Sequence, residues 1–594
     1  MSTADGGGTA NSAGSTGNPV SATGSSMPSG SETTSGEAAD STDAGSTGSG
    51  ESGSTSTGGL PALPRDDVYF WVQGAASLDV DAEDGLFAND DAPRDASLTD
   101  VDTMTTRGGS VAITPTGAFV YTAPEGFWGL DTFTYTTQAR EDAPESATAR
   151  IYVRPVAAQI EDLQQFEAGF SITGDEQGNE VGGHIQAIPD YDGDGLPELA
   201  IAGAAAFSYP GETAGTTTDP AVYIITSGPY PGELTPTILA TDAGGFVIVV
   251  LDASGADLAS TAAGYFDGDN MLDLAFNAPF LNLSDERAFV LYGDQDASSF
   301  GLDSFTFTDD GYVIGGVYQR LTGLGDIDGD GLDEFGFSQF DCTVVYGLDA
   351  AQSFNVTAGG AVPMDRGFTL EGTGNCYLEA LGDVNGDGQP ELLAYDGQQS
   401  ATVIWGSDTL TSKTLAAAVD DDEGYRVNGF TDVIWMSGGG DFNGDGAADV
   451  LVNRGGITGD AYVVYGKATT GEVGVFDAEV TTIFQGGGAG PGSMHLGGDV
   501  NGDGLDDLVI AKPAEGRVYV VYGSGAGAPI NLPSTTGDGL RGFVIEGVPL
   551  PELKSRTTQM LDLNGDGADD IVFGSPSGQG GLGVVYVVYG VRTQ

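Results

Sequence analysis

The sequence predicts an all-β protein whose larger part is a seven-bladed β-propeller, and three observations support this prediction. An acidic loop of the form D-x-[DN]-G-D-G-x-x-[DE] occurs seven times, and successive copies start 57 to 75 residues apart. Similar strand-like segments surround each copy in the same order. One such segment stands alone before the first loop, and its counterpart is missing after the last loop.

Each acidic loop is predicted to bind a calcium ion. Ca²⁺ prefers six to eight oxygen ligands, and side chains at positions one, three, five and nine can supply them together with the backbone carbonyl at position seven. Glycine occupies position four in all seven copies, where a tight curl needs positive φ. The predicted ligands are Asp190, Asp192, Asp194, Leu196, Glu198, Asp267, Asp269, Met271, Asp273, Asp326, Asp328, Asp330, Leu332, Glu334, Asp383, Asn385, Asp387, Gln389, Glu391, Asp441, Asn443, Asp445, Ala447, Asp449, Asp499, Asn501, Asp503, Leu505, Asp507, Asp562, Asn564, Asp566, Ala568 and Asp570.

The second loop begins with Tyr265 where the first acidic ligand should stand. We therefore expect it to be the weakest site or to be empty, so that the chain binds six to seven Ca²⁺ ions.

An EF-hand opens with similar spacing, but the sequence excludes it. An EF-hand needs a bidentate acid at position twelve and flanking helices. Position twelve is apolar in every copy: Ile201, Phe276, Phe337, Ala394, Val452, Ile510 and Phe573. A short apolar run follows each loop, which is typical of a buried strand.

Four strands are expected in each repeat. The loop lies between a first strand and the apolar run, a segment such as VYVVYG follows, and a G-[FY]-x-[IVL] segment ends the unit. A linear array of separate domains is excluded because each unit is too small and too rich in glycine to bury its own core. The isolated segment at 169–174 is expected to complete the blade that starts near Thr557, which closes the ring and removes exposed sheet edges.

The order of loop, turn and VYVVYG strand resembles the FG-GAP repeat of the integrin α-subunit propeller and of bacterial proteins with FG-GAP or VCBS repeats. The turns at 511–513 (AKP) and 574–576 (GSP) strengthen the resemblance, which covers residues 160–594. It implies a seven-bladed propeller with calcium loops on one rim and a role in adhesion or protein recognition. The inserted domain, membrane span and leg region of integrins are not seen, and all seven repeats carry the loop, which is closer to the bacterial pattern.

Two further regions precede the repeats. Residues 1–64 consist almost wholly of Ser, Gly, Thr, Ala and acidic residues, which predicts a disordered tether. Residues 65–156 are expected to form a small β-sandwich that resembles cadherin-like or bacterial Ig-like modules, commonly spacers of surface adhesins. Its acidic segment is either a solvated loop or another Ca²⁺ site, with Asp79, Asp81, Asp84, Asn89, Asp90 and Asp91 as the candidates.

No signal peptide is visible near Met1. The tether nevertheless favours an extracellular or cell-surface location on a bacterium, with a lipid anchor upstream of the tether as one way of attachment. We expect no transmembrane segment, and we expect the protein to be a monomer.

The formal net charge is −68, from 87 acidic and 19 basic residues. This charge excludes nucleic acid and anionic membrane surfaces as partners. The two cysteines, Cys342 and Cys376, are expected at the same end of strands in neighbouring blades. They form either a disulfide, as in an exported protein, or two buried free thiols.

Catalysis is not expected. The chain has two histidines, His184 and His495, each in a strand that enters a loop, and both are interpreted as packed strand residues. No nucleophile, zinc-protease or phosphate-loop motif is present. The predicted function is that of a calcium-binding, non-catalytic surface protein for adhesion or for recognition of a protein or polysaccharide. The insertion at 203–220 is either a recognition loop or a loop without such a role. The alternative is an exported polysaccharide-active enzyme, a lyase or hydrolase, built on a propeller.

Overall fold

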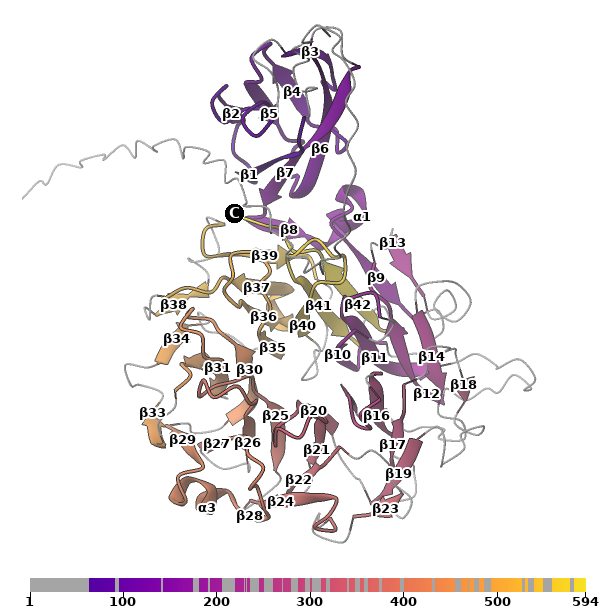
Figure 1. Cartoon of the computed structure of the whole chain (residues 1–594), viewed down its shortest axis with the longest axis vertical. Coiled ribbons are helices and arrows are strands. Elements are labelled where there is room, and N and C mark those ends of the chain that lie inside the picture. The colour runs from indigo at the N-terminus through magenta and orange to yellow at the C-terminus, as the bar shows by residue number, and fades with distance from the viewer. Residues whose placement is uncertain are drawn as a thin grey trace, which may run out of the picture. The chain divides into compact units, whose positions relative to one another are not determined.

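The structure is a computed structural model that describes most of residues 64–593 (Figure 1). The residues outside this description are 1–63, 91–95, 140–142, 175–180, 191–192, 206–218, 229, 231, 236–244, 250–259, 270, 279–286, 294–299, 302–310, 317–320, 339–340, 348–352, 357–361, 373–375, 396–399, 430–432, 455–460, 468–469, 475–479, 485–492, 526–528, 533–538, 549–557, 577–581 and 594. The predicted tether, Asp192, Asp91 and most of the insertion at 203–220 therefore lie outside the described residues. The chain divides into two compact units.

The smaller unit contains two antiparallel sheets, as the alternating pattern at 65–156 predicts. One sheet has the order β1-β7-β6-β3 and the other β2-β5-β4. The strands are β1 (Asp67–Val72), β2 (Leu78–Val80), β3 (Ala96–Val101), β4 (Ser110–Ile113), β5 (Phe119–Thr122), β6 (Gly129–Ala139) and β7 (Glu145–Arg154). Aromatic rings join the two sheets, because Phe119 of β5 contacts Tyr69 of β1 and Phe133 of β6 edge to face at 4.8 and 5.5 Å.

Among the described residues, the larger unit has seven five-stranded sheets. The first strands, which come before the acidic loops, are β10 (His184–Ile188), β15 (Ser260–Gly264), β20 (Leu321–Gly325), β25 (Tyr377–Ala380), β30 (Val433–Gly440), β35 (Ser493–Leu496) and β40 (Thr558–Leu561). The second strands, directly after the loops, are β11 (Glu198–Ala205), β16 (Asp273–Ala278), β21 (Glu334–Ser338), β26 (Leu392–Tyr395), β31 (Asp449–Arg454), β36 (Leu508–Lys512) and β41 (Asp570–Ser575).

The third and fourth strands continue each sheet in an antiparallel manner. The third strands contain the VYVVYG-like segments: β12 (Asp219–Ile225), β17 (Arg287–Leu291), β22 (Cys342–Val345), β27 (Ser400–Ile404), β32 (Ala461–Val464), β37 (Arg517–Val521) and β42 (Val584–Val588). The fourth strands are β14 (Gly245–Val249), β19 (Gly311–Gly315), β24 (Gly367–Glu371), β29 (Gly424–Asn428), β34 (Val480–Phe484), β39 (Gly542–Glu546) and β9 (Gly169–Thr173).

A short fifth strand, which was not predicted from the sequence, pairs in parallel with each fourth strand. It comes from the chain just before the fourth strand of the next sheet. The fifth strands are β18 (Phe300–Gly301), β23 (Phe354–Asn355), β28 (Lys413–Thr414), β33 (Gly471–Gly474), β38 (Ile530–Asn531), β8 (Ala157–Gln159) and β13 (Gly232–Leu234). The chain segment that leads into the fourth strand of one sheet therefore also adds an edge strand to the sheet before it.

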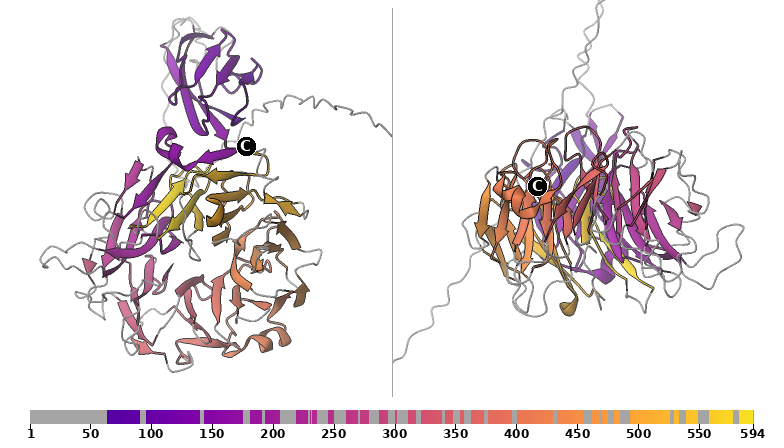
Figure 2. Two further views of the ribbon diagram at one scale, coloured as in Figure 1. Left: turned by 180° about the vertical axis from the view of Figure 1, so that it is seen from behind. Right: turned by 90° about the horizontal axis from the view of Figure 1, so that it is seen from below.

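The seven sheets form a closed cycle around a common centre (Figures 1 and 2). The first strands lie next to one another in the order β10, β15, β20, β25, β30, β35, β40 and again β10. The expected closing strand is confirmed, since β9 pairs with β42 in antiparallel register from Gly169 opposite Val588 to Thr173 opposite Val584. This arrangement is consistent with a β-propeller.

The first residue of the G-[FY]-x-[IVL] segment must be glycine for a steric reason. Gly169 and Gly367 have φ of 151° and 152°, and a Cβ there would lie 2.0 and 1.9 Å from the carbonyl oxygens of Val587 and Val344. The fourth strand can approach the third strand only without a side chain at this point.

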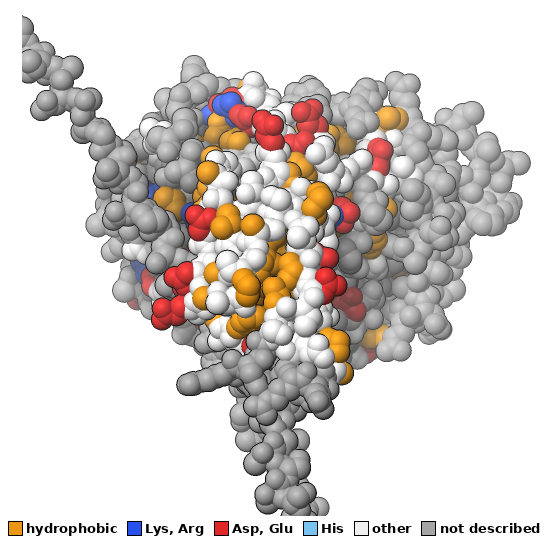
Figure 3. All heavy atoms as spheres, turned by 90° about the horizontal axis from the view of Figure 1, so that it is seen from above, with side chains coloured by type: hydrophobic (Ala, Val, Ile, Leu, Met, Phe, Trp, Pro, Cys, Tyr) orange, Lys and Arg blue, Asp and Glu red, His pale blue; other side chains and the backbone are white. Residues whose placement is uncertain are grey.

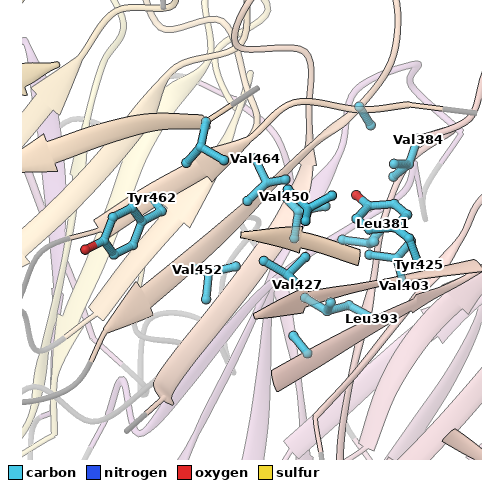
Figure 4. Close-up of a cluster of buried hydrophobic side chains, with 14 of the residues drawn as sticks. Leu381, Val384, Leu393, Val403, Tyr425, Val427, Val450, Val452, Tyr462 and Val464 are labelled. Atoms are coloured by element: carbon cyan, nitrogen blue, oxygen red, sulfur yellow. The ribbon is translucent and has the colours of Figure 1, made fainter. Parts of the chain in front are cut away.

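Hydrophobic clusters fill the space between neighbouring sheets. In one of them, Leu393, Val403 and Tyr425 of one sheet pack with Val450 and Tyr462 of the next (Figure 4). Another spans the closure point and combines Phe170 and Val585 with Ile185 and Tyr223. Because each core is shared by two sheets, a single sheet would expose its apolar faces.

Cys342 and Cys376 form a disulfide with a Cα–Cα distance of 5.1 Å. Of the two alternatives left open by the sequence, the disulfide is therefore the one found. Cys342 begins β22 and Cys376 directly precedes β25, so the bond joins two neighbouring sheets.

The described helices are short and were not predicted: α1 (Leu163–Phe166), α3 (Leu415–Asp420) and two 3₁₀ turns, η1 (Ile160–Asp162) and η3 (Pro513–Glu515). None of the helices in the described residues has the length and apolarity needed to cross a membrane. On the face seen in Figure 3, acidic side chains outnumber basic ones, in keeping with the net charge.

Candidate metal centre

Each acidic loop connects the first strand of one sheet to the second. We number them loop 1 (190–198), loop 2 (265–273), loop 3 (326–334), loop 4 (383–391), loop 5 (441–449), loop 6 (499–507) and loop 7 (562–570). Every described glycine at positions four and six has positive φ, between 69° and 94°. The prediction that these glycines adopt positive φ in a tight curl is therefore confirmed.

The aspartate at position one organises the backbone of its loop. Asp326 accepts the N–H groups of Gly329, Asp330 and Gly331 at 2.7, 3.0 and 3.0 Å. The first residues of loops 4, 5 and 7 accept the same three N–H groups. In loops 1 and 6, Asp190 and Asp499 each accept two of them.

The aspartate at position five fixes the residue at position seven. In loop 3, Asp330 accepts the N–H of Leu332 at 2.9 Å. The same bond occurs in all seven loops, so the predicted backbone ligands lie beside a carboxylate: Leu196, Met271, Leu332, Gln389, Ala447, Leu505 and Ala568. A ligand role for their carbonyl oxygens stays a prediction.

The acid at position nine is fully buried in every loop. The exposed fraction is 0% for Glu198, Asp273, Glu334, Glu391, Asp449, Asp507 and Asp570. Glu334 accepts the N–H of Ile327 at 2.9 Å, within its own loop, and that of Gly347, directly after the third strand, at 3.3 Å. Equivalent bonds occur in loops 2, 5, 6 and 7.

The glycine that ends the VYVVYG-like segment therefore belongs to the candidate site, although it was not among the predicted site residues. A Cβ on Gly347 would lie 2.6 Å from the Cβ of Leu332. A glycine recurs directly after the third strand of the repeats, and this recurrence was the sequence signal that could have identified it.

Burial raises the pKa of six of these carboxyl groups, those of loops 2 to 7, because transfer from water disfavours the charged form. The pKa is raised to about 7 for Asp273, Glu391 and Asp449 and to about 9 for Glu334. It is also raised well above the usual value for Asp507 and Asp570. Neighbouring aspartates of the same loop add to the effect, so each loop concentrates negative charge around a buried acid.

Three carboxylates converge in the first four loops. Their ligand atoms all lie within 4.8 Å of one another, in the groups Asp190, Asp194 and Glu198; Asp267, Asp269 and Asp273; Asp326, Asp328 and Glu334; and Asp383, Asp387 and Glu391. These all-oxygen donor sets fit a hard divalent cation.

Asparagine replaces aspartate at position three in loops 4 to 7. The amide nitrogens of Asn385, Asn443 and Asn564 donate to the acid at position nine at 2.8, 3.4 and 3.2 Å. Half a turn of the amide brings its oxygen to the same place, so the side chain can serve a carboxylate with its nitrogen or a cation with its oxygen.

Neighbouring loops are joined by a reciprocal pair of hydrogen bonds that we call the loop clasp. The N–H of Tyr265 in loop 2 donates to the carboxylate of Asp333 in loop 3 at 2.9 Å, and the N–H of Asp333 donates to the carbonyl oxygen of Tyr265 at 3.0 Å. The same pair joins Asp441 to Asp506 and Asp499 to Asp569. Position eight of one loop thus holds position one of the previous loop.

The two histidines lie in the first strands of different sheets, His184 in β10 and His495 in β35. His184 is 4% exposed. His495 lies 3.5 Å from the hydroxyl of Ser437, and its burial lowers its pKa to about 4. A group that stays neutral at physiological pH and contacts a serine in the neighbouring first strand agrees with the predicted packing role.

Comparison with known proteins gives two family matches. A bacterial Ig domain matches residues 61–152, and the FG-GAP repeat matches residues 491–528 and 556–588. The chain therefore contains a bacterial Ig domain and FG-GAP repeats.

Individual relatives match only in part. Integrin alpha-PS2 of Drosophila melanogaster is 30% identical over 30% of this chain and 12% of its own length, and integrin alpha-4 of Xenopus laevis is 31% identical over 22% and 14%. Phosphatidylinositol-glycan-specific phospholipase D of Mus musculus is 37% identical over 17% of this chain and 13% of its own length. The repeat region is thus integrin-α-like, and the matched segments span a small part of each relative.

Proposed function

We propose that the larger unit is a seven-bladed propeller held together by calcium and that the protein is a non-catalytic adhesion or recognition protein outside the cell. The observation that carries this proposal is the burial of an acid at position nine of all seven loops. Seven buried carboxylates, each next to further aspartates, are costly unless a cation compensates them.

The donor sets favour Ca²⁺ over other ions. All candidate ligands are carboxylate, amide or backbone oxygens, which suit hard cations, and the flexible curled loop tolerates more than six ligands, as Ca²⁺ prefers and Mg²⁺ does not. Loops 1 and 3 to 7 keep oxygen-bearing side chains at all four predicted positions, whereas loop 2 has Tyr265 in the first. We therefore propose six strong sites and one weak one.

The location and the class of function rest on three supports. A disulfide between neighbouring sheets fits an oxidising compartment. The FG-GAP repeats and the integrin-like segments point to adhesion or recognition. The acidic surface disfavours nucleic acid and anionic membranes and leaves an extracellular protein as the partner we favour.

Binding can be tested with the full chain immobilised on a sensor surface. Panels of extracellular proteins and of polysaccharides are passed over it in millimolar calcium and then after calcium is removed with EDTA. We expect saturable binding to a protein in calcium, lost after chelation and regained when calcium returns. Binding confined to polysaccharides would mean that the partner is a polysaccharide and not a protein. Absence of calcium-dependent binding in both panels would contradict the proposed function.

Absence of catalysis needs a separate test, because one relative is named as a phospholipase. Purified protein is incubated in calcium with uronic-acid polymers and with a phosphatidylinositol-glycan substrate, and products are followed by mass spectrometry. We expect no turnover above that of heat-denatured protein. Turnover of either substrate that scales with protein concentration would show that the protein is an enzyme.

A further inference from the structure

A second cluster of oxygen ligands lies in the smaller unit, far from the acidic loops in sequence. It combines Asp67, which begins β1, with Asn89 and Asp90 on the connection between β2 and β3. Asp67 is only 4% exposed. A buried aspartate at the start of a strand needs a compensating donor or a cation.

The carboxylate of Asp67 is incompletely satisfied. Among the described residues, no hydrogen-bond donor reaches its Oδ2 atom, which is buried. The Oδ1 atom of Asn89 is likewise buried and has no donor among the described residues. Most buried polar atoms have a partner, so two unsatisfied oxygens in one region point to a missing positive group.

The orientation of Asn89 is fixed by its other atom. Its amide nitrogen donates to the carbonyl oxygen of Asp66 at 2.9 Å, which is the residue directly before Asp67. Turning the amide would break this bond, so the oxygen remains in the buried cluster.

Tyr135 of β6 shows how many acceptors meet at this place. Its hydroxyl lies 2.8 Å from the carbonyl oxygen of Leu86, 3.1 Å from that of Arg65 and 3.5 Å from Oδ1 of Asp90. The same hydroxyl lowers the pKa of Asp67 by hydrogen bonding, against a larger effect of burial that raises it to about 8. One hydroxyl hydrogen thus faces two carboxylates and two carbonyl groups.

We propose that Asp67, Asn89 and Asp90 bind one divalent cation, Ca²⁺, in the smaller unit. Two carboxylates and one neutral amide leave two negative charges, which a divalent ion balances. A proton on Asp67 compensates one charge and leaves the oxygen of Asn89 without a partner. The carbonyl groups of Arg65 and Leu86, which meet at Tyr135, are further oxygen donors within reach of the same region. All of these ligands are of the type that Ca²⁺ prefers.

The proposal does not depend on the acidic loops. The candidate ligands all belong to the smaller unit, whereas the seven loops belong to the larger one. The two sets can therefore be followed separately by a method that resolves segments of the chain.

Hydrogen exchange of the full chain, read by mass spectrometry, gives that resolution. We expect calcium to slow exchange in peptides from 65–90 and 129–139, with a titration midpoint of their own. Asp67→Asn should raise this midpoint by at least about tenfold, as expected on loss of a charged ligand, and should leave peptides from the seven loops unchanged. The matched control is Asp100→Asn, which removes the same charge at an exposed position of β3 in the same unit, away from every candidate ligand.

Asn89→Asp distinguishes the two alternatives, because it should strengthen calcium binding if a cation is bound here and should only destabilise the smaller unit if none is. With a cation, a third carboxylate should lower the calcium midpoint at least about threefold. Without one, it places a third acid beside Asp67 and Asp90 and should speed exchange in calcium and in EDTA alike. The proposal is overturned if calcium leaves the smaller unit's exchange unchanged while the loops respond, or if Asn89→Asp only destabilises that unit. If calcium changes exchange in neither unit, both this site and the proposed calcium loops of the larger unit are contradicted, and this outcome is distinct from loss of the smaller unit's response alone.

Discussion

Loops 2 and 3 lie in neighbouring sheets and differ most at their first residue. In loop 3, Asp326 accepts three backbone N–H groups of its own loop. In loop 2, Tyr265 has no carboxylate to do this, and its backbone is held from outside by Asp333 of loop 3. Both loops still bring three carboxylates together within 4.8 Å. The first aspartate therefore organises the loop, whereas the later positions can assemble a donor set without it.

The largest expected effect concerns the acid at position nine, which both loops share. Its raised pKa, about 7 for Asp273 and about 9 for Glu334, compares with about 4 in an unfolded chain. A carboxyl group whose pKa is raised on folding stabilises the protonated folded state, and this contribution is lost as the pH rises through the folded-state pKa. Without calcium, the protein should therefore have a higher melting temperature at pH 6 than at pH 8.

Calcium should reverse this order. The ion binds the deprotonated carboxylates, so its stabilising effect grows as the pH rises. Melting curves at both pH values, with EDTA and with millimolar calcium, test both statements. The same pH order with and without calcium would contradict the assignment of position nine as a ligand.

The next largest effect is expected from Asp326→Ala, with Tyr265→Ala as the matched change in loop 2. Loss of Asp326 leaves the N–H groups of Gly329 and Gly331 without an acceptor, whereas that of Asp330 keeps Asp328. This loss should lower the free energy of unfolding by about 2 kcal/mol. Tyr265→Ala removes packing against a hydrophobic cluster but no loop hydrogen bond of its side chain. Urea unfolding in calcium compares stability, and isothermal titration compares the number of sites. We expect Asp326→Ala to lose one strong site and Tyr265→Ala to lose none, and equal losses of sites would refute the comparison.

A smaller effect is expected from breaking the loop clasp. Asp333→Ala removes the carboxylate that accepts the N–H of Tyr265, at a cost of about 1 kcal/mol. Because loop 2 lacks its own organising aspartate, the calcium affinity of loop 2 should fall more than that of loop 3. In the clasp between loops 6 and 7, Asp569→Ala is the control, since Asp499 still organises loop 6. Equal effects of the two substitutions on the preceding loop would show that the clasp does not substitute for the first aspartate.

The smallest effect is expected from Tyr265→Asp, which gives loop 2 the missing ligand. It removes a partly buried ring, so the calcium-free protein should lose about 1 kcal/mol of stability. In calcium the new carboxylate should raise the affinity of the weakest site by about threefold to tenfold. Titration with a fluorescent competitor measures this site, and an unchanged weakest affinity would mean that loop 2 fails for another reason.

Much of the larger unit could be predicted because its information is local and repeated. Position twelve excluded EF-hands, and the solitary GFSIT segment identified β9 as the closing strand. The fifth strands escaped prediction because they are two to four residues long and pair in parallel with a neighbouring sheet. A short segment of this kind has no hydrophobic periodicity of its own.

The missed parts of the sites depend on contacts between distant segments. The clasp relies on position eight, which varies among the loops and gains its role only from the preceding loop. Gly347 matters because the third strand returns to loop 3. Likewise, Asp67 stands in an ordinary strand pattern, and only the fold brings Asn89 to the residue beside it, Asp66, whose carbonyl oxygen accepts the amide N–H. The sequence could not decide between a disulfide and two free thiols for the same reason, since the distance between the cysteines cannot be obtained from their spacing in the sequence.

The most direct test of the central claim is thermal unfolding of the full chain with calcium and after its removal. Ligand that binds only the folded state stabilises it by about 2.7 kcal/mol per site at a concentration one hundred times the Kd. With six or seven such sites, calcium removal should lower the melting temperature of the larger unit by at least about 10 °C. Addition of calcium should restore it, whereas magnesium should not. A melting temperature that is the same in calcium and in EDTA would contradict the claim that the acidic loops hold the ring together through calcium.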